Sequence, residues 1–276
     1  MKYKLINLNS NRVIAVLITV FLVSAGHAQN VDAQDFPEEI QTDISSLSLL
    51  RKSKKYIDLI EAAITYKKDN LVFSQVYDAY IVEAYFQLEN FDKVIEYVKP
   101  YIDKESYLFA EGTAEIYLGQ AYINLNKKAE GCNVLKTIES NDAQFKIMYM
   151  SNCFEAKEYV FNIAGNKQNT STNLKLNKGD VVGFKANGKV SYGMFTGYSG
   201  PEGFLNGAYR TYNRTQEMNH GELFYTTSND PYLFYDLDNL SLIKSSGNVV
   251  FHINDKEVRN NSGSFKATLK VYSETN

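Results

Sequence analysis

The sequence predicts a multidomain α plus all-β protein, in which a helical half precedes a β half and both follow an export signal. Three observations lead to this prediction. From about residue 40 to 159, apolar residues recur at helical spacing, and Pro and Gly are almost absent. After residue 160, short runs rich in Val, Phe, Tyr and Thr are separated by Gly, Asn and Asp. The first 28 residues have the organisation of a secretory signal.

The signal is recognised by its three successive regions. Lys2, Lys4 and Arg12 precede the apolar run "VIAVLITVFLVSAG", and small residues around Gly26 and Ala28 provide a cleavage site. We therefore expect a signal peptide over residues 1–28 and an exported protein, in a bacterial periplasm, secreted or at the cell surface. An uncleaved membrane anchor is the alternative, but the apolar core is short and the polar "HAQNVDAQD" follows it. No integral membrane span is expected after cleavage.

Composition limits the classes of partner and of metal site. The 276 residues are 44% hydrophobic, enough for two modest cores, and the formal net charge of -3 provides no basic field for nucleic acid. The only cysteines are Cys132 and Cys153, and without a CxxC or Cys/His cluster they do not predict zinc. In an exported protein they form either one disulfide between neighbouring helices or two buried thiols.

A local pattern recurs three times in the helical half. The segments are "KKYIDLIEAA" around Tyr56, "ENFDKVIEYV" around Phe91 and "NKKAEGCNVL" around Lys128, and they are separated by 35 and 37 residues. This period resembles that of tetratricopeptide repeats, which are stacked helical hairpins. The resemblance implies a tetratricopeptide-like domain over residues 36–156 that binds a protein or a peptide. An unrelated antiparallel helical bundle remains the alternative.

The third repeat and the segment after it carry more detailed expectations. In "YLGQAYINLNKKAEGCNVLKTI", Gly119 and Gly131 fall on successive helices, and such small residues allow two helices to approach closely. Stacked hairpins need a cap, so we expect "AQFKIMYMSNCFEAKEYV" to be a capping helix of the repeats.

The β half is predicted to be a sandwich over residues 157–276, because several strands follow one another at short spacing without helices between them. The segments "NKGD" and "ANGK" are both expected to be turns, the second because its Asn-Gly pair accepts positive φ.

Five blocks of this half carry a resemblance to a known family. They are, in order, "LNKGDVVGFKANGKVSYG", "GPEG", "GELFYTTS", "NVVFHIND" and "NNSGSFKATLKVY". Their order and spacing are similar to those of the calcium-dependent galactose-binding bacterial lectins of the PA-IL (LecA) type, over roughly residues 158–273. The resemblance implies a galactose-binding-like β-sandwich of the jelly-roll type.

The resemblance also implies a set of metal ligands. By position, Ca²⁺ would be held by the main-chain oxygen of Tyr192 and by the side chains of Asp255, Asn260 and Asn261. Carboxylate, amide and carbonyl oxygens are the ligands that Ca²⁺ takes in proteins. In such lectins two vicinal sugar hydroxyls complete the shell, and the resemblance implies that Asp255 and Asn260 also hydrogen-bond the glycan.

The sequence departs from the lectin pattern at two places. Between Asp255 and Asn260 it has only "KEVR", and we expect Lys256 and Arg259 either to point away from the cation or to replace it by pairing with Asp255. The His-Pro segment after "GPxG" is replaced by "FLNGAYRTYNRTQ", so the resemblance does not imply specificity for galactose. We expect a different sugar to contact residues of this segment, namely Asn206, Tyr209, Arg210 and Tyr212.

Together these patterns predict an exported carbohydrate-binding adaptor, with a glycan on the sandwich and a protein on the helices. The alternative is a non-catalytic envelope scaffolding protein whose sandwich binds no metal and whose helices make the contacts. We do not expect an enzyme, because His220 and His252 lie in no catalytic motif. A glycan-processing enzyme would need two carboxylates paired by the fold.

Overall fold

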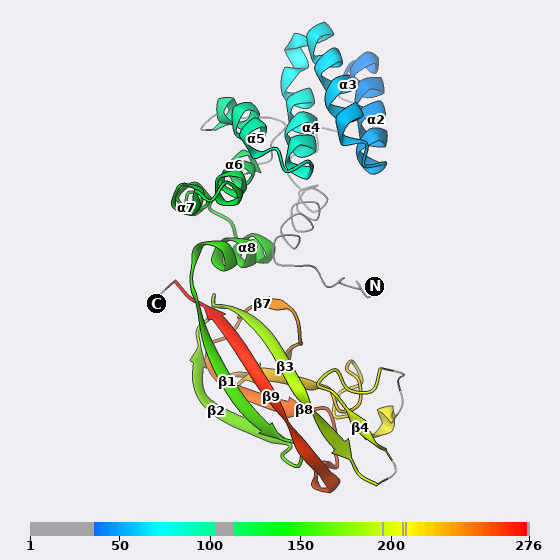
Figure 1. Cartoon of the computed structure of the whole chain (residues 1–276), viewed down its shortest axis with the longest axis vertical. Coiled ribbons are helices and arrows are strands. Elements are labelled where there is room, and N and C mark those ends of the chain that lie inside the picture. Colours follow the sequence, from blue (N-terminus) through cyan, green and yellow to red (C-terminus); the bar gives the residue numbers. More distant parts are fainter. Residues whose placement is uncertain (1–35, 103–112, 195, 206, 208, 275–276) are drawn as a thin grey trace. The chain divides into compact units, whose positions relative to one another are not determined.

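The structure is a computed structural model that describes residues 36–102, 113–194, 196–205, 207 and 209–274 (Figure 1). The predicted signal peptide, residues 1–28, lies outside the described residues. The chain divides into two compact units, one ending at Gln144 and the other beginning at Phe145, here called the helical unit and the β unit. No helix among the described residues is both long enough and apolar enough to cross a bilayer.

The described residues of the helical unit form helices. Two 3₁₀ turns lie between or after the α-helices. The elements are α2 (Glu38–Lys52), α3 (Tyr56–Asp69), η2 (Leu71–Phe73), α4 (Ser74–Gln87), α5 (Phe91–Val98), η3 (Lys99–Tyr101), α6 (Thr113–Asn124) and α7 (Lys128–Lys136).

Three turns of the helical unit have the same backbone conformation. Lys54, Glu89 and Asn126 all adopt φ near +60°, and each lies two residues before the start of α3, α5 or α7. In each turn the amide of the next residue donates to the carbonyl five residues before it, as Asn90 does to Tyr85. The spacings of 35 and 37 residues that the sequence shows are therefore spacings between equivalent turns.

The expected close approach of two helices occurs between α6 and α7. A Cβ added at Gly131 would lie 2.5 Å from the carbonyl oxygen of Gly119, and a Cβ at Gly119 would lie 2.6 Å from Cγ of Leu135. Real Cβ atoms do not come so close to backbone oxygens, so position 131 requires glycine for the helices to pack at this distance, and a Cβ at position 119 would require the side chain of Leu135 to move.

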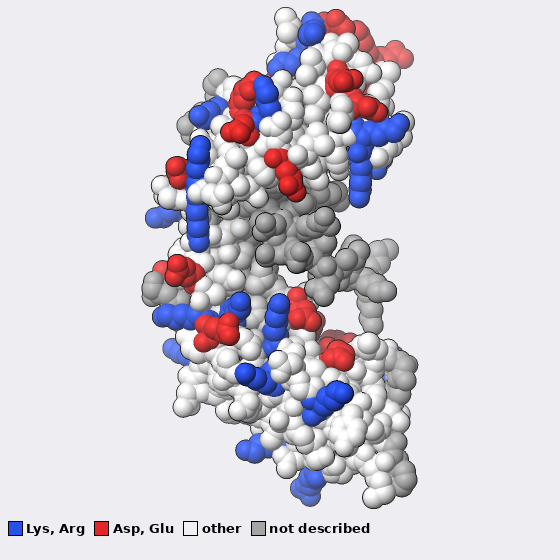
Figure 2. All heavy atoms as spheres, viewed as in Figure 1, with Lys and Arg blue, Asp and Glu red and all other residues white. Residues whose placement is uncertain are grey.

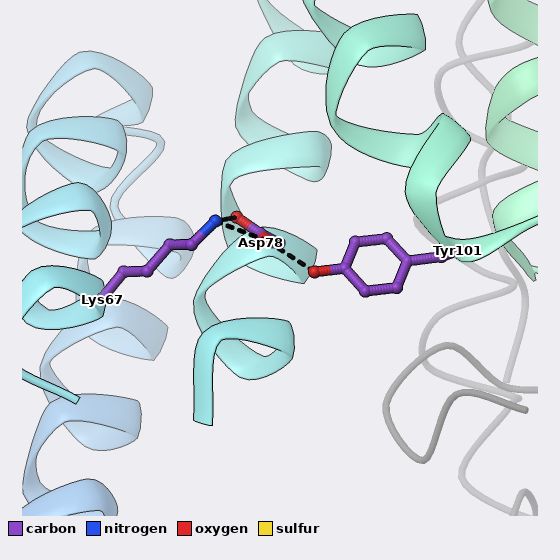
Figure 3. A network of polar contacts seen from close by, with 3 residues as sticks. All are labelled: Lys67, Asp78 and Tyr101. Carbon is purple, nitrogen blue, oxygen red and sulfur yellow. Dashed lines mark hydrogen bonds and ion pairs between the residues drawn. The ribbon is translucent and has the colours of Figure 1, made fainter. Parts of the chain in front are cut away.

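Buried acidic side chains of the helical unit are paired with partners from other elements. The carboxylate of Asp78 on α4 accepts hydrogen bonds from Nζ of Lys67 at 2.7 Å and from the hydroxyl of Tyr101 at 2.5 Å (Figure 3). The hydroxyl of Tyr77 donates to Oδ2 of Asp43 on α2 at 2.7 Å. These contacts tie α4 to α2, α3 and η3.

The β unit contains one helix and two antiparallel sheets. The first sheet has the order β1-β9-β3-β4 with β7 also paired to β3, and the second has the order β2-β8-β5-β6. The elements are α8 (Ala143–Cys153), β1 (Ala156–Ala164), β2 (Asn169–Leu176), β3 (Val181–Tyr192), β4 (Tyr198–Ser199), η4 (Arg210–Tyr212), β5 (Leu223–Thr227), β6 (Asp230–Tyr235), β7 (Leu240–Leu242), β8 (Gly247–Ile253), η5 (Val258–Asn260) and β9 (Asn261–Tyr272).

Side chains from both sheets form one hydrophobic cluster. Period-2 alternation along β9 directs Phe265, Ala267 and Leu269 inward, where they meet Phe251 of β8 and Tyr225 of β5. The rings of Phe184, Tyr225 and Phe251 lie within 5.3–6.1 Å of one another. This shared core fixes the register of the long strands that end at the candidate site.

Helix α8 packs against strands of the β unit. Its Ile147 and Met150 cluster with Val181 of β3, and Phe154 and Tyr272 pack against them. The two units accordingly divide after Gln144, whereas we had expected the boundary between residues 156 and 157. Both cysteines, in α7 and α8, are disulfide-bonded.

One of the two predicted turns is a turn and the other is not. In "NKGD" the amide of Asp180 donates to the carbonyl of Asn177, and Gly179 has φ of +98°. The prediction for "ANGK" is wrong, because these residues lie inside β3, which pairs with β9 without interruption. Gly188 does take a positive φ there, but its role is to allow close approach, since a Cβ would lie 2.5 Å from the carbonyl oxygen of Ser264.

Candidate functional site

The four predicted metal-binding residues lie at one end of the first sheet. Tyr192 is the last residue of β3 and stands opposite Asn261, the first residue of β9. Asn260 ends η5, and its Nδ2 lies 2.8 Å from the position that a Cβ on Gly193 would occupy. Register and turn geometry therefore bring these segments, which are distant in sequence, to the same place.

Asp255 and Asn261 are in direct contact. Nδ2 of Asn261 donates to Oδ2 of Asp255 at 2.9 Å and to the carbonyl oxygen of Gly165 at 3.3 Å. The other oxygen of Asp255, Oδ1, accepts from the backbone amide of Glu257 at 2.9 Å. Asp255 is 4% exposed and Asn261 is 6% exposed, so this carboxylate and this amide are both withdrawn from water.

The amide oxygen of Asn261 is buried and accepts no hydrogen bond from the described residues. Its orientation is fixed by its neighbours, because Nδ2 faces two acceptors, Asp255 and Gly165, and only the NH₂ group can donate to them. An unpaired buried polar atom costs about 1–3 kcal/mol. Beside a buried carboxylate, such an oxygen fits a cation better than it fits an ordinary loop.

The two cationic side chains of the short loop leave the carboxylate unpaired. Nζ of Lys256 donates to the carbonyl oxygen of Thr211 at 3.0 Å, away from Asp255. Arg259 is exposed and forms no ion pair within 4.0 Å with any described residue. Of the two outcomes expected from the sequence, the geometry agrees with the one in which these side chains point away from the cation.

A fully buried amide, that of Asn254, organises the loop beside the site. Its Oδ1 accepts from the backbone amides of Arg214 and Thr215, each at 2.9 Å. Its Nδ2 donates to three carbonyl oxygens, those of Thr215, Met218 and Asn219. These five bonds fasten residues 214–219 to the end of β8, directly next to Asp255.

Aromatic rings line the same end of the β unit. The buried ring of His220 lies 5.5 Å from that of Tyr192, 5.6 Å from that of Tyr209 and 6.4 Å from that of Tyr212. Tyr209 is 39% exposed and Tyr212 is 55% exposed. Tyr209 also has φ of +61°, which is strained for a bulky residue and is typical of binding sites.

Burial affects the titration of the groups behind these rings. It lowers the pKa of His220, although the nearby charge of Asp255 acts in the opposite direction. The imidazole is thereby kept neutral at pH 7, and its Nδ1 lies 3.0 Å from Oδ1 of the buried Asn213. Burial raises the pKa of Tyr192, whose hydroxyl donates to the carbonyl oxygen of Gly221 at 2.7 Å.

Of the predicted sugar-contacting residues, the structure describes three. Tyr209, Arg210 and Tyr212 lie in and before η4, and the backbone amide of Lys256 donates to the carbonyl oxygen of Tyr212 at 2.9 Å, so this segment adjoins the loop that carries Asp255. Asn206 lies outside the described residues. Sequence reasoning missed Asn213, Asn254 and the position of His220 under the rings; a buried amide has no signature in a single sequence.

His252 belongs to a separate polar cluster. Its Nε2 lies 2.9 Å from the hydroxyl of Thr226, its Nδ1 lies 2.8 Å from Oδ1 of Asn169, and its ring stacks on Phe224. Burial, with a smaller effect from the charge of Arg214, lowers the pKa of His252 to about 4. These contacts are those of a structural histidine.

The types of ligand atom at the candidate site favour one class of metal ion over others. Among the described residues no group of three His, Cys, Asp or Glu side chains could hold a metal ion. The candidate site instead offers one carboxylate, two amides and a main-chain carbonyl, which suit a hard cation such as Ca²⁺ and not zinc or copper.

The comparisons with known proteins found likeness to solved structures. No family model matches the chain, and no curated protein matches it either. Among solved structures it is similar to one described as the EclA N-terminal domain, a PllA-like lectin, with 15% sequence identity and a TM-score of 0.33. The match covers 42% of this chain and 98% of that one.

Proposed function

We propose that the protein is an exported adaptor, in which the β unit is a lectin-like sandwich that binds a glycan through Ca²⁺ and the tetratricopeptide-like helices bind a protein. In this proposal Tyr192, Asp255, Asn260 and Asn261 hold the ion. Four protein ligands are fewer than the six to eight oxygens that Ca²⁺ takes, so positions remain for vicinal hydroxyls of a sugar or for water. The proposal includes no catalytic step.

The observation that carries the metal proposal is the unpaired amide oxygen of Asn261 beside the carboxylate of Asp255. In the part of the chain that the structure describes, no Lys or Arg lies within 4.0 Å of that carboxylate. A buried charge without a partner is strongly unfavourable. A divalent cation would compensate both the charge and the orphaned oxygen at once.

The rings of Tyr209 and Tyr212 support the glycan part of the proposal. They are exposed, they stand beside the loop that carries Asp255, and the strained backbone of Tyr209 is held by the packing below it. Aromatic faces provide large apolar area with little loss of side-chain entropy on binding.

The test is calcium binding by the full chain, followed by thermal unfolding with and without chelator. If the site binds Ca²⁺, the β unit gains about 2.7 kcal/mol of stability at a free concentration one hundred times the Kd. The variant Asp255→Asn keeps the size of the side chain and removes its charge, so we expect it to lose this gain. A glycan array with Ca²⁺ and with chelator then tests the sugar.

Asp180→Asn is the matched control. Asp180 is another buried carboxylate of the β unit, but it accepts from the amide of Asn177 in a turn at the opposite end of β3, about 36 Å from Tyr192 along the strand. It should retain the full response to Ca²⁺. Absence of any calcium-dependent change in the unsubstituted chain would favour the alternative, a scaffolding protein whose sandwich binds no metal and whose Asn261 only closes a loop.

The three equivalent turns support the tetratricopeptide-like part of the proposal. Units that repeat the same turn can stack and present one continuous surface to a peptide or a protein. Cross-linking of the full chain in its native compartment, followed by mapping of the cross-linked sites, tests this. We expect sites between residues 36 and 144, and cross-links confined to residues 145–276 would contradict it.

A further inference from the structure

The two loops of the candidate site carry four cations that form no ion pair with the described residues. Over residues 209–217 and 255–261 the chain has four cations and three carboxylates, and one of these carboxylates is the buried Asp255. The whole chain has the opposite balance, with a formal net charge of -3. The four cations are Arg210, Arg214, Lys256 and Arg259, and none lies within 4.0 Å of a carboxylate of the described residues.

Basic and acidic side chains are both visible on the helical unit and on the β unit (Figure 2). Cations without a carboxylate partner attract a ligand of the opposite charge and increase its association rate.

Two of these cations are held in place by neutral acceptors. Nζ of Lys256 donates to the carbonyl oxygen of Thr211 at 3.0 Å. Nη1 of Arg214 lies 3.2 Å from the carbonyl oxygen of Gln168, 2.9 Å from Oδ1 of Asn169 and 3.2 Å from Nδ1 of His252. These bonds orient both side chains without neutralising their charge, and other donors of each remain for a ligand.

One turn connects Arg214 with the candidate metal ligands. The carbonyl oxygen of Gly165 accepts from Asn261, and that of Gln168, three residues later, accepts from Arg214. The Cα atoms of Gly165 and Gln168 are at most about 11 Å apart. Lys256 follows Asp255 directly in the sequence, and its Nζ reaches the carbonyl oxygen of Thr211, in the segment that carries the exposed tyrosine rings.

We infer that the glycan is acidic, and that Arg214 and Lys256 bind a carboxylate or a sulfate group on the sugar that chelates the metal or on the next sugar. This inference rests on the proposed function and specifies its ligand. Arginine matches the planar geometry of a carboxylate with two parallel hydrogen bonds, and lysine contributes a point charge.

The test compares matched saccharides on the full chain in the presence of Ca²⁺. The array contains neutral hexopyranosides, the corresponding uronates and the corresponding 6-sulfates, and calorimetry gives the affinity of the best set. We expect an acidic member to bind about tenfold or more tightly than its neutral parent, since a hydrogen bond to a charged group is worth about 1.5–3 kcal/mol. A preference for the uronate identifies a carboxylate, and a preference for the 6-sulfate identifies a sulfate.

Three variants assign the preference to these side chains. Lys256→Gln and Arg214→Gln should each reduce the affinity for the acidic member about tenfold and change that for the neutral parent by less than about twofold. Lys185→Gln, an exposed lysine of β3 about 23 Å from Tyr192 along the strand, should change neither.

Two results would overturn the inference, and they are distinguishable from failure of the proposed function. Equal affinity for neutral and acidic members, with calcium dependence intact, removes the acidic ligand and leaves the lectin proposal standing. An acidic preference that persists in both Lys256→Gln and Arg214→Gln would show that these two side chains do not bind the acidic group. It would also leave the lectin proposal standing. If neither Ca²⁺ nor any saccharide binds, both proposals are wrong.

Discussion

The helical unit and the β unit bury acidic side chains in different ways. In the helical unit Asp43 is bonded by a tyrosine hydroxyl, Asp78 by Lys67 and Tyr101, and Glu83 lies 3.5 Å from Nη1 of Arg51. In the β unit Asp255 receives only an amide nitrogen and a backbone N–H, next to an oxygen without a donor. Among the described residues, Asp78 and Glu83 pair with cations, whereas Asp255, like Asp43, has no cationic partner and differs in lying next to an amide oxygen that accepts no hydrogen bond. The difference separates polar groups that maintain structure from those available to a ligand.

The largest loss of stability is expected at Asp78, whose carboxylate is paired with Lys67. Asp78→Ala should destabilise the helical unit by about 3 kcal/mol, because it leaves Nζ of Lys67 and the hydroxyl of Tyr101 without their acceptor. The cost is below that of a fully buried pair, since the side chain of Lys67 is 30% exposed. Hydrogen exchange of amides in α4 measures it. Glu96→Ala, which breaks the exposed pair with Lys93, should cost less than about 0.5 kcal/mol, and equal effects would contradict the comparison.

Acidification should affect the two units in opposite directions. The pKa of His252 is lowered from 6.5 to about 4, so its contribution is complete above pH 6.5 and is lost as the pH falls from 6.5 to 4. This would reduce the free energy of unfolding of the β unit by about 3 kcal/mol over that range. His252→Gln should remove this part of the pH dependence, as measured by denaturant unfolding at several pH values.

Residues 36–144 of the helical unit contain no His, and burial raises the pKa of Glu83, so the proton is bound more tightly in the folded state. The contribution of Glu83 to stability therefore increases as the pH falls through its raised pKa. A pH dependence of the β unit that is unchanged in His252→Gln would show that other groups are responsible.

A smaller gain is expected at the repeated turns. The helical unit uses Lys54, Glu89 and Asn126 at positive φ, whereas most such positions in the β unit are Gly. Glu89→Gly should stabilise the helical unit by about 1 kcal/mol, because glycine adopts this conformation without the Cβ penalty. Thermal unfolding measures the gain, and Glu96→Gly, in the interior of α5, should lower stability instead.

The smallest change in stability is expected on substitution of Asp255. Without metal, Asp255→Asn should change the stability of the β unit by less than about 1 kcal/mol, since it removes a buried charge that has no cationic partner. Chelator-treated protein and denaturant unfolding provide the measurement. A loss as large as that of Asp78→Ala would mean that Asp255 maintains the fold in the same way as the acids of the helical unit.

Much of the fold was predictable because it depends on local patterns. The segments quoted around Tyr56, Phe91 and Lys128 begin α3, α5 and α7, and the glycine pair of α6 and α7 is in contact as expected. The division between helices and strands was also predictable, since the hydrophobic period changes near residue 156.

The features that could not be predicted depend on contacts between residues distant in sequence, and a local pattern does not identify the contacting residues. The apolar side chains of α8 identify it as a packed helix, but they do not say that Val181 and Tyr272 are its neighbours. The Asn-Gly pair of "ANGK" signals positive φ in a turn and in a strand alike, and only the pairing of Gly188 with Phe265 distinguishes them. For the same reason the sequence suggested the ligand positions but left open which way Lys256 would point.

Tyr192 connects two parts of the candidate site through opposite ends of one residue. Its carbonyl belongs to the proposed ion-binding set, while its hydroxyl donates to the carbonyl oxygen of Gly221 and its ring packs against His220, beneath the exposed tyrosines. A Cβ on Gly221 would lie 2.5 Å from the tyrosine ring, so the ring is packed directly against the backbone of Gly221. Occupancy by an ion should thus alter the surroundings of this ring. Since the chain has no Trp, a single Phe204→Trp replacement next to it would report loading as a change in emission, free of background from any other indole.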